Sequence, residues 1–109
     1  MNQRRSERIS LQIRLIVETN LHGGYQVYLD AFTLAVSAHG GLLEMGLKVS
    51  RGQALILISP ISRSRQSCTV VESKHLRDGM FAVAFEFATP APQFWPISFP
   101  PVSWELVRS

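Results

Sequence analysis

The stretch RRSERISLQIRLIVET, residues 4–19, decides the fold. From position 9 onward, apolar side chains at 9, 11, 13, 15 and 17 alternate with polar ones at 10, 12, 14 and 18, and Ile16 is the one exception. Successive side chains of a β-strand point to opposite faces, so this alternation predicts a half-buried strand over Ile9–Thr19 with a fixed register. The arginines just before it form a basic arm attached to the start of a sheet.

Five further segments have the character of strands, and glycine-containing turns separate them. They are residues 25–37, 42–45, 53–59, 66–74 and 80–87. In the last of these, aromatic and apolar side chains at 81, 83, 85 and 87 share one face. No segment has the pattern of a helix of appreciable length. Six short strands at roughly ten-residue spacing predict an all-β fold, and a small six-stranded antiparallel β-barrel is favoured because closure removes exposed edges.

The second strand contains a change of phase. Tyr25 and Val27 begin one alternating set, but beyond Asp30–Ala31 the apolar positions become 32, 34 and 36. A change of phase within a strand indicates an extra residue in the ladder. We therefore expect a bulge or break near Asp30–Ala31, with Phe32 in the apolar set.

The last twenty residues, 90–109, differ from the rest. They hold five of the six prolines and four large aromatic residues between Phe94 and Trp104. Proline excludes a regular helix or a central strand here, and burying one large aromatic contributes roughly 2–3 kcal/mol. We expect this tail to pack on the barrel; the alternative is that its aromatics form a partner-binding patch.

Composition limits the possible classes of protein. The chain has 109 residues, 46 % of them hydrophobic and 17 % charged, which predicts one folded domain comprising a basic arm (1–8), a barrel (9–89) and the tail (90–109). No apolar run is long enough to span a membrane, and no signal peptide is recognisable. The single Cys68 excludes an intrachain disulfide and fits a core residue in a cytoplasmic protein, and no metal-ligand spacing is present.

Charge is concentrated in the arm. The net charge is +3, and three of the eleven cations lie between Arg4 and Arg8. The arm could be a solvated terminus, or it could bind an anion. Arg63 and Arg65 form a second basic loop, for which we expect solvation unless the loop borders the same mouth of the barrel.

Two motifs together resemble the PilZ domain family, small β-barrels that act as bacterial receptors for cyclic di-GMP. The first motif, R-x-x-x-R, is met by Arg4 and Arg8, with Arg5 between them. The second, D/N-x-S-x-x-G, corresponds to residues 35–40, AVSAHG, where Ser37 and Gly40 match and Ala35 replaces the acid or amide. The resemblance covers about residues 3–90, and the aromatic tail looks like one found in a subset of stand-alone PilZ-like proteins.

The resemblance implies a ligand site made of the arm and the second motif. Its residues are Arg4, Arg5, Arg8, Ser37, His39 and Gly40. Arginine can bind a phosphate or the O6/N7 edge of guanine bidentately, and it can stack on a purine. The resemblance also implies that the arm folds over the barrel on binding. Without a ligand, Ser37 and Gly40 would be turn residues and His39 an exposed turn side chain.

Four functions are considered for this chain. The first is a non-catalytic cyclic di-GMP receptor that signals to a protein partner, and the second is a degenerate PilZ-like domain that works by protein contact alone, which Ala35 favours. An enzyme is not expected, because no catalytic grouping or cofactor motif is present. Binding to DNA or to single strands is not expected, because the strand over 80–87 carries no cation among its aromatics. We expect a monomer or a weak dimer.

Overall fold

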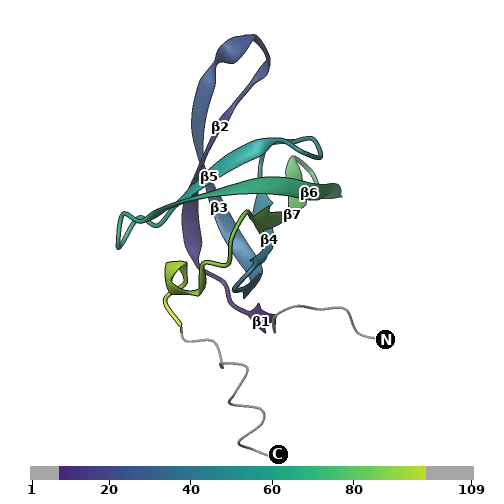
Figure 1. Cartoon of the computed structure of the whole chain (residues 1–109). Helices are drawn as coiled ribbons and strands as arrows, with labels where there is room; N and C mark the ends of the chain where they lie inside the picture. The colour runs from purple at the N-terminus through teal and green to yellow at the C-terminus, as the bar shows by residue number, and fades with distance from the viewer. Residues whose placement is uncertain (1–7, 98–109) are drawn as a thin grey trace, which may run out of the picture.

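The computed structural model describes residues 8–97 and contains strands with two short 3-10 turns but no α-helix in that range (Figure 1). The 3-10 turns are η1 (His22–Gly24) and η2 (Pro92–Phe94). The strands are β1 (Ile9–Ser10), β2 (Arg14–Asn20), β3 (Gln26–Ser37), β4 (Gly40–Met45), β5 (Ala54–Ile58), β6 (Arg65–Arg77) and β7 (Met80–Phe87).

Six strands close into an antiparallel barrel. The order β3-β2-β5-β6-β7-β4 returns to its start because β4 also pairs with β3. The predicted all-β class and the predicted six-stranded antiparallel barrel are therefore confirmed. β3 closes the barrel, since β2 pairs along one of its edges and β4 along the other.

The first predicted strand is divided into β1 and β2, so the expectation of one continuous strand was wrong. Both pieces pair with β3, but the ladder is interrupted between them over residues 11–13. The fully buried Thr33 bridges this gap. Its backbone amide donates to the Ile13 carbonyl at 2.9 Å, and its hydroxyl accepts from the Ile13 amide at 2.9 Å and donates to the Leu11 carbonyl at 2.5 Å. The predicted alternation of burial nevertheless persists through the interruption.

The predicted change of phase at Asp30–Ala31 was also misplaced. β3 keeps its alternation through Thr33, and its register against β4 shifts between Thr33 and Ala35. The bulge inserts Leu34 into the strand, which returns Val36 to the interior. Phe32 therefore lies on the outer face, 41 % exposed, and does not join the core.

The core is built from the inward side chains of all six barrel strands. Each fully buried aliphatic side chain contributes about 1.5–3 kcal/mol relative to an exposed one. The fully buried side chains of the core include Leu15, Val17, Val36, Leu43, Met45, Leu55, Leu57, Val70 and Val83.

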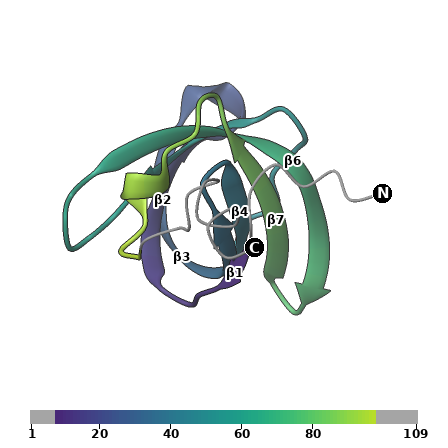
Figure 2. The same ribbon diagram turned by 60° about the horizontal axis from the view of Figure 1, so that its bottom comes forward.

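The start of the tail packs against the end of the barrel. In Figure 2 the segment after β7 crosses toward β2 and ends in η2. Trp95 is only 3 % exposed, and its ring lies 6.2 Å from that of Phe85, 6.0 Å from Phe87 and 5.0 Å from Phe94. The tail thus completes the core at this end. The other predicted tail aromatics, Phe99 and Trp104, lie outside the described residues.

Cys68 is a core residue, as predicted, and is 4 % exposed. Burial raises the pKa of its thiol to about 12, because the apolar interior disfavours the thiolate. The folded state thus retains a proton that the unfolded chain, with an ordinary thiol, loses above about pH 9. The stability contributed by this difference is complete below pH 9 and declines toward pH 12.

This difference predicts a measurable loss of stability in mild alkali. When the pH is raised from 8 to 10, the contribution of Cys68 to the free energy of unfolding is expected to fall by about 1.4 kcal/mol. Urea denaturation at both pH values, in the wild type and in Cys68→Val, isolates this contribution from the other titrating groups. An identical decline in the two proteins would contradict it.

Candidate functional site

The turn between β3 and β4 carries three of the predicted site residues. Ser37 is buried, and its hydroxyl accepts from the His39 amide at 3.2 Å and donates to the Gly40 carbonyl at 3.4 Å. Such a bond from a serine to the amide two residues on stabilises a tight turn. Ser37 therefore has a structural role here that requires no ligand.

Gly40 is required by the close approach of β4 and β7. A Cβ at this position would lie 2.2 Å from the carbonyl oxygen of Phe85, far inside van der Waals contact. Its φ of 155° is also one that side chains rarely adopt. The neighbouring Gly41 is similarly confined, because its Cβ would lie 2.5 Å from the Ala35 carbonyl oxygen. The glycine of the second motif thus serves barrel closure.

Three consecutive carbonyls of the turn accept hydrogen bonds from β7 and the tail. The Ser37 carbonyl accepts from the Trp95 indole N–H at 2.8 Å. The Ala38 carbonyl accepts from the Ala91 amide at 2.8 Å, and the His39 carbonyl accepts from the Phe87 amide at 2.8 Å. The turn is consequently fixed by groups about fifty residues later in the chain.

β1 brings the end of the basic arm to this turn. Ile9 pairs with Val36 and Ser10 pairs with Ala35, in antiparallel register. Arg8, which is exposed, directly precedes Ile9, and the partner of Ile9, Val36, directly precedes Ser37. The last residue of the first motif thus comes close to the second motif, about thirty residues later in the sequence. Arg4 and Arg5 lie outside the described residues.

The Ser10–Ala35 pair places a hydroxyl beside the alanine of the second motif. Residues directly opposite in an antiparallel ladder project to the same face, with Cβ atoms about 4.5–5.5 Å apart. Ser10 is exposed and Ala35 partly exposed. Sequence reasoning placed Ser10 on the polar face of its strand but could not identify its partner, so its position in the site was missed.

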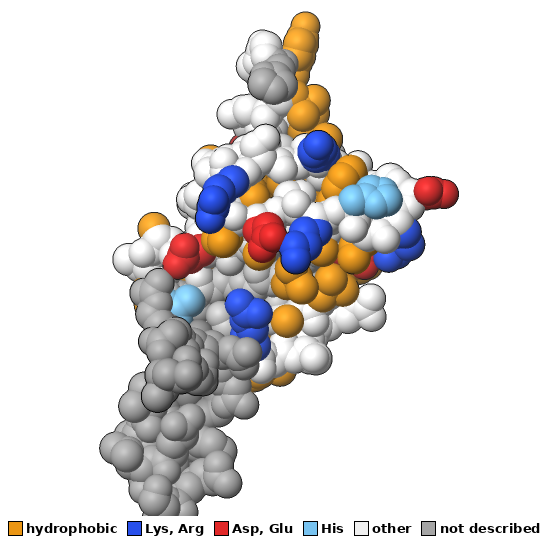
Figure 3. Space-filling view, turned by 90° about the vertical axis from the view of Figure 1, so that its right-hand side faces the viewer, with side chains coloured by type: hydrophobic (Ala, Val, Ile, Leu, Met, Phe, Trp, Pro, Cys, Tyr) orange, Lys and Arg blue, Asp and Glu red, His pale blue; other side chains and the backbone are white. Residues whose placement is uncertain are grey.

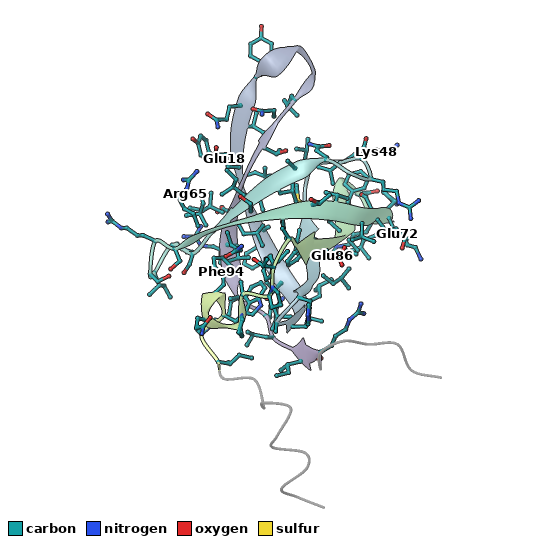
Figure 4. All side chains as sticks on the ribbon, viewed as in Figure 1. Glu18, Lys48, Arg65, Glu72, Glu86 and Phe94 are labelled. Carbon is teal, nitrogen blue, oxygen red and sulfur yellow. The ribbon has the colours of Figure 1, made fainter. Side chains whose placement is uncertain are left out.

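The two cations of the second basic loop differ: Arg65 is held in an ion pair, and Arg63 is exposed. Arg65 is bonded to Glu18 of β2 at 2.8 Å, and Figure 4 shows the two labelled side chains on the wall of the barrel, above the turn that carries Phe94. Gln26 donates a further hydrogen bond to the same carboxylate, whose side chain is only 9 % exposed. Arg65 therefore already has an ion-pair partner within the barrel wall. Arg63 lies in the loop with a left-handed backbone conformation, at a φ of 64°.

A groove of about 590 Å³ lies between the tail and the β5–β6 loop. Ile61 projects almost completely into solvent at its border, and Phe94 and Trp95 line it on the tail side. Another side is lined by Ile13, which precedes β2, and by Arg14 and Leu15 at the start of β2. Its lining is largely apolar, with a guanidinium group at one margin.

No group of three or more His, Cys, Asp or Glu side chains within residues 8–97 could hold a metal ion. No helix in the described part of the chain is long and apolar enough to cross a membrane.

A scan against models of known protein families found none that matches this chain, and a search of curated proteins found no match.

The structural role of Gly40 predicts a severe effect of adding one methyl group. Gly40→Ala is expected to lower the free energy of unfolding by more than about 2 kcal/mol, because the new Cβ meets backbone that cannot move freely. Gly52→Ala is the matched control: its φ is 86°, but nothing lies within 4 Å of its Cβ. That control should lose only about 1 kcal/mol in chemical denaturation. Equal losses would show that the contact with β7 is unimportant.

Proposed function

We propose that this chain is a PilZ-like receptor domain that binds cyclic di-GMP and transmits its presence in bacterial second-messenger signalling, without catalysis. The observation that carries the proposal is the pairing of β1 with the end of β3. It brings Ile9, the residue after Arg8, beside Val36, the residue before Ser37, so that the end of the first motif adjoins the second. A site assembled from distant segments is a reason to assign both motifs to one ligand.

The chemistry of the arm suits this ligand. Cyclic di-GMP carries two phosphates and two guanines, and an arginine fork can bond either kind of group bidentately. Arg8 is exposed at the start of β1, where its guanidinium can reach a ligand placed over the turn. Arg4 and Arg5 precede it on the same arm and supply the remaining positive charge.

In this proposal the turn supplies shape and a small number of contacts. The hydroxyl of Ser37 already bonds within the turn, but an oxygen with two lone pairs can accept one further hydrogen bond. His39 is half-buried at the same turn and can offer its ring to a base. Gly40 contributes by keeping β4 close to β7.

Ser10 can compensate for the missing acceptor at Ala35. The PilZ pattern has Asp or Asn at this place, whose oxygen accepts from the guanine N–H edge, and alanine cannot do so. The Ser10 hydroxyl lies on the opposing strand and projects to the same face. It can therefore accept the same proton from the neighbouring strand, which makes Ala35 compatible with nucleotide binding.

The turn also offers a route from the ligand to a protein partner. Trp95 and Ala91 donate hydrogen bonds to carbonyls of this turn, so a change in the conformation of the turn alters the hydrogen bonds that hold the tail. The groove beside the tail contains Phe94 and the highly exposed Ile61, so it can present the changed surface to a downstream protein.

The same groove supports a second candidate function. If Ala35 prevents nucleotide binding, the domain is a protein-interaction module that uses this apolar groove. Binding of single-stranded nucleic acid has less support, because Phe85 and Phe87 are each only 4 % exposed and cannot stack with bases.

Calorimetric titration of cyclic di-GMP into the protein tests the proposal. We expect saturable binding that weakens by about tenfold to a hundredfold, or is lost, in the Arg4→Ala/Arg8→Ala variant, because charged hydrogen bonds to phosphate and guanine disappear. Arg51→Ala removes an exposed cation from another loop and should bind like the wild type. If about 1 mM ligand, a concentration that detects weak binding, gives neither a heat of binding nor a shift in the melting temperature of the protein, the receptor proposal is wrong and the protein-interaction module remains.

Substitutions at the Ser10–Ala35 pair test the proposed compensation separately. Ser10→Ala should weaken binding by about tenfold, and Ala35→Asp should strengthen it or rescue the first variant, because the carboxylate supplies the acceptor directly. Ser67→Ala, at an exposed position on β6, is the matched control. If Ser10→Ala binds as tightly as this control, Ser10 does not replace the missing acceptor.

A further inference from the structure

The β2–β3 hairpin extends beyond the barrel as a two-stranded ribbon (Figure 1). β3 pairs with β2 as far as Gln26 opposite Asn20, but its pairing with β4 begins only at Ala31 opposite Met45. Five residues of β3, numbers 26–30, therefore have a partner strand on one edge only. In Figure 3 hydrophobic side chains continue along this projection toward its tip.

The two edges of the ribbon differ in how they are covered. On the β2 edge, the side-chain amide of Gln53 donates to the hydroxyl of Thr19 at 2.9 Å and lies 3.4 Å from the Asn20 carbonyl. On the β3 edge, no described residue outside β2 makes a backbone hydrogen bond with residues 26–30. This edge consequently presents a short row of unpaired backbone donors and acceptors.

The free edge lacks the usual features that prevent pairing with another strand. Natural edge strands are protected by proline, lysine, bulges or uncompensated charge. Residues 26–30 contain neither proline nor lysine, and the bulge of β3 lies farther along, between Thr33 and Ala35. The one charge, Asp30, is neutralised by Arg14 at 2.5 Å.

We propose that this edge pairs with the same edge of a second copy, giving a two-fold symmetric dimer centred on Tyr28. In an antiparallel pair about this residue, Tyr28 lies opposite Tyr28 of the other copy. Val27 then lies opposite Leu29, and Gln26 lies opposite Asp30. The sequence QVYLD is thus complementary to itself: aromatic meets aromatic, apolar meets apolar, and an amide donor meets a carboxylate.

The exposure of the side chains agrees with this arrangement. Tyr28 is 60 % exposed on the outer face although it is a large aromatic in mid-strand, while Val27 and Leu29 are half-buried on the other face. Pairing would cover Tyr28 and continue the sheet across the two-fold axis, since β2 opposite Tyr28–Asp30 is already paired with β5 on its other edge. Because only five residue pairs meet, the interface is narrow, so we expect a weak, concentration-dependent dimer.

The proposed interface is separate from the proposed ligand site. The hairpin projects from one end of the barrel, whereas β1 and η2 lie at the other (Figures 1 and 2). Dimerisation would leave the turn at Ser37 and the start of the basic arm accessible. The two proposals can therefore fail independently.

Oxidative cross-linking of Tyr28→Cys tests the register. Directly opposite residues have Cα atoms about 4.5–5.5 Å apart, which suits a disulfide, and the native Cys68 is buried and its thiol protonated. Tyr25→Cys is the control: it is more exposed, at 73 %, but its two copies would lie about 20 Å apart in this register. We expect rapid covalent dimer formation only for Tyr28→Cys, and equal rates for both variants would overturn the register.

Sedimentation equilibrium of wild type and Tyr28→Lys tests the dimer itself. Two lysines would face each other across the two-fold axis, whereas within one copy each would lie opposite Glu18 and preserve the hairpin. We expect the wild type to dimerise between about 10 µM and 1 mM, as befits a small interface, and the variant to associate at least tenfold more weakly. A wild type that stays monomeric over this range, or that associates only with foreign extended peptides, would overturn the proposal.

Discussion

Closure of the barrel depends on hydrogen bonding along both edges of one strand, β3. At its C-terminal half β3 is paired with β1 or β2 on one side and β4 on the other, which fixes the turn at Ser37 and brings the basic arm to it. At its N-terminal half only β2 is present, which leaves residues 26–30 with a free edge. A single strand longer than its partner thus produces a closed site at one end and an open edge at the other.

Much of this fold could be predicted because alternation reports which face of a strand is buried. Met80–Phe87 has the predicted bounds, and its aromatic face lies in the core. The failures arose where a side chain replaced the ladder or a residue was added to it. The hydroxyl of Thr33 bonds to the chain between β1 and β2, which the local sequence does not indicate. The bulge at Leu34 does change the phase of the sequence, but the pattern put it too early because Phe32 is apolar and exposed while Thr33 is polar and buried.

The candidate site was predictable in part for a related reason. Motif spacing identified Ser37, His39 and Gly40, which the structure places on one turn, and Arg8, which β1 brings beside them. It did not identify Ser10 or the bond from Trp95 to the Ser37 carbonyl, because both depend on which distant segments become neighbours. The roles of Ser37 and Gly40 within the turn show that both matching residues of the second motif are needed by the fold itself, with or without a ligand.

The three bonded carbonyls of the Ser37–His39 turn have a consequence for local opening. The tail segment between Phe87 and Trp95 cannot leave the barrel without exposing three carbonyl groups and the aromatic core beneath them. Nor can the turn reorganise while those bonds remain. The beginning of the tail and the β3–β4 turn therefore form one cooperative unit, whose opening free energy is shared by segments that the sequence separates by about half its length.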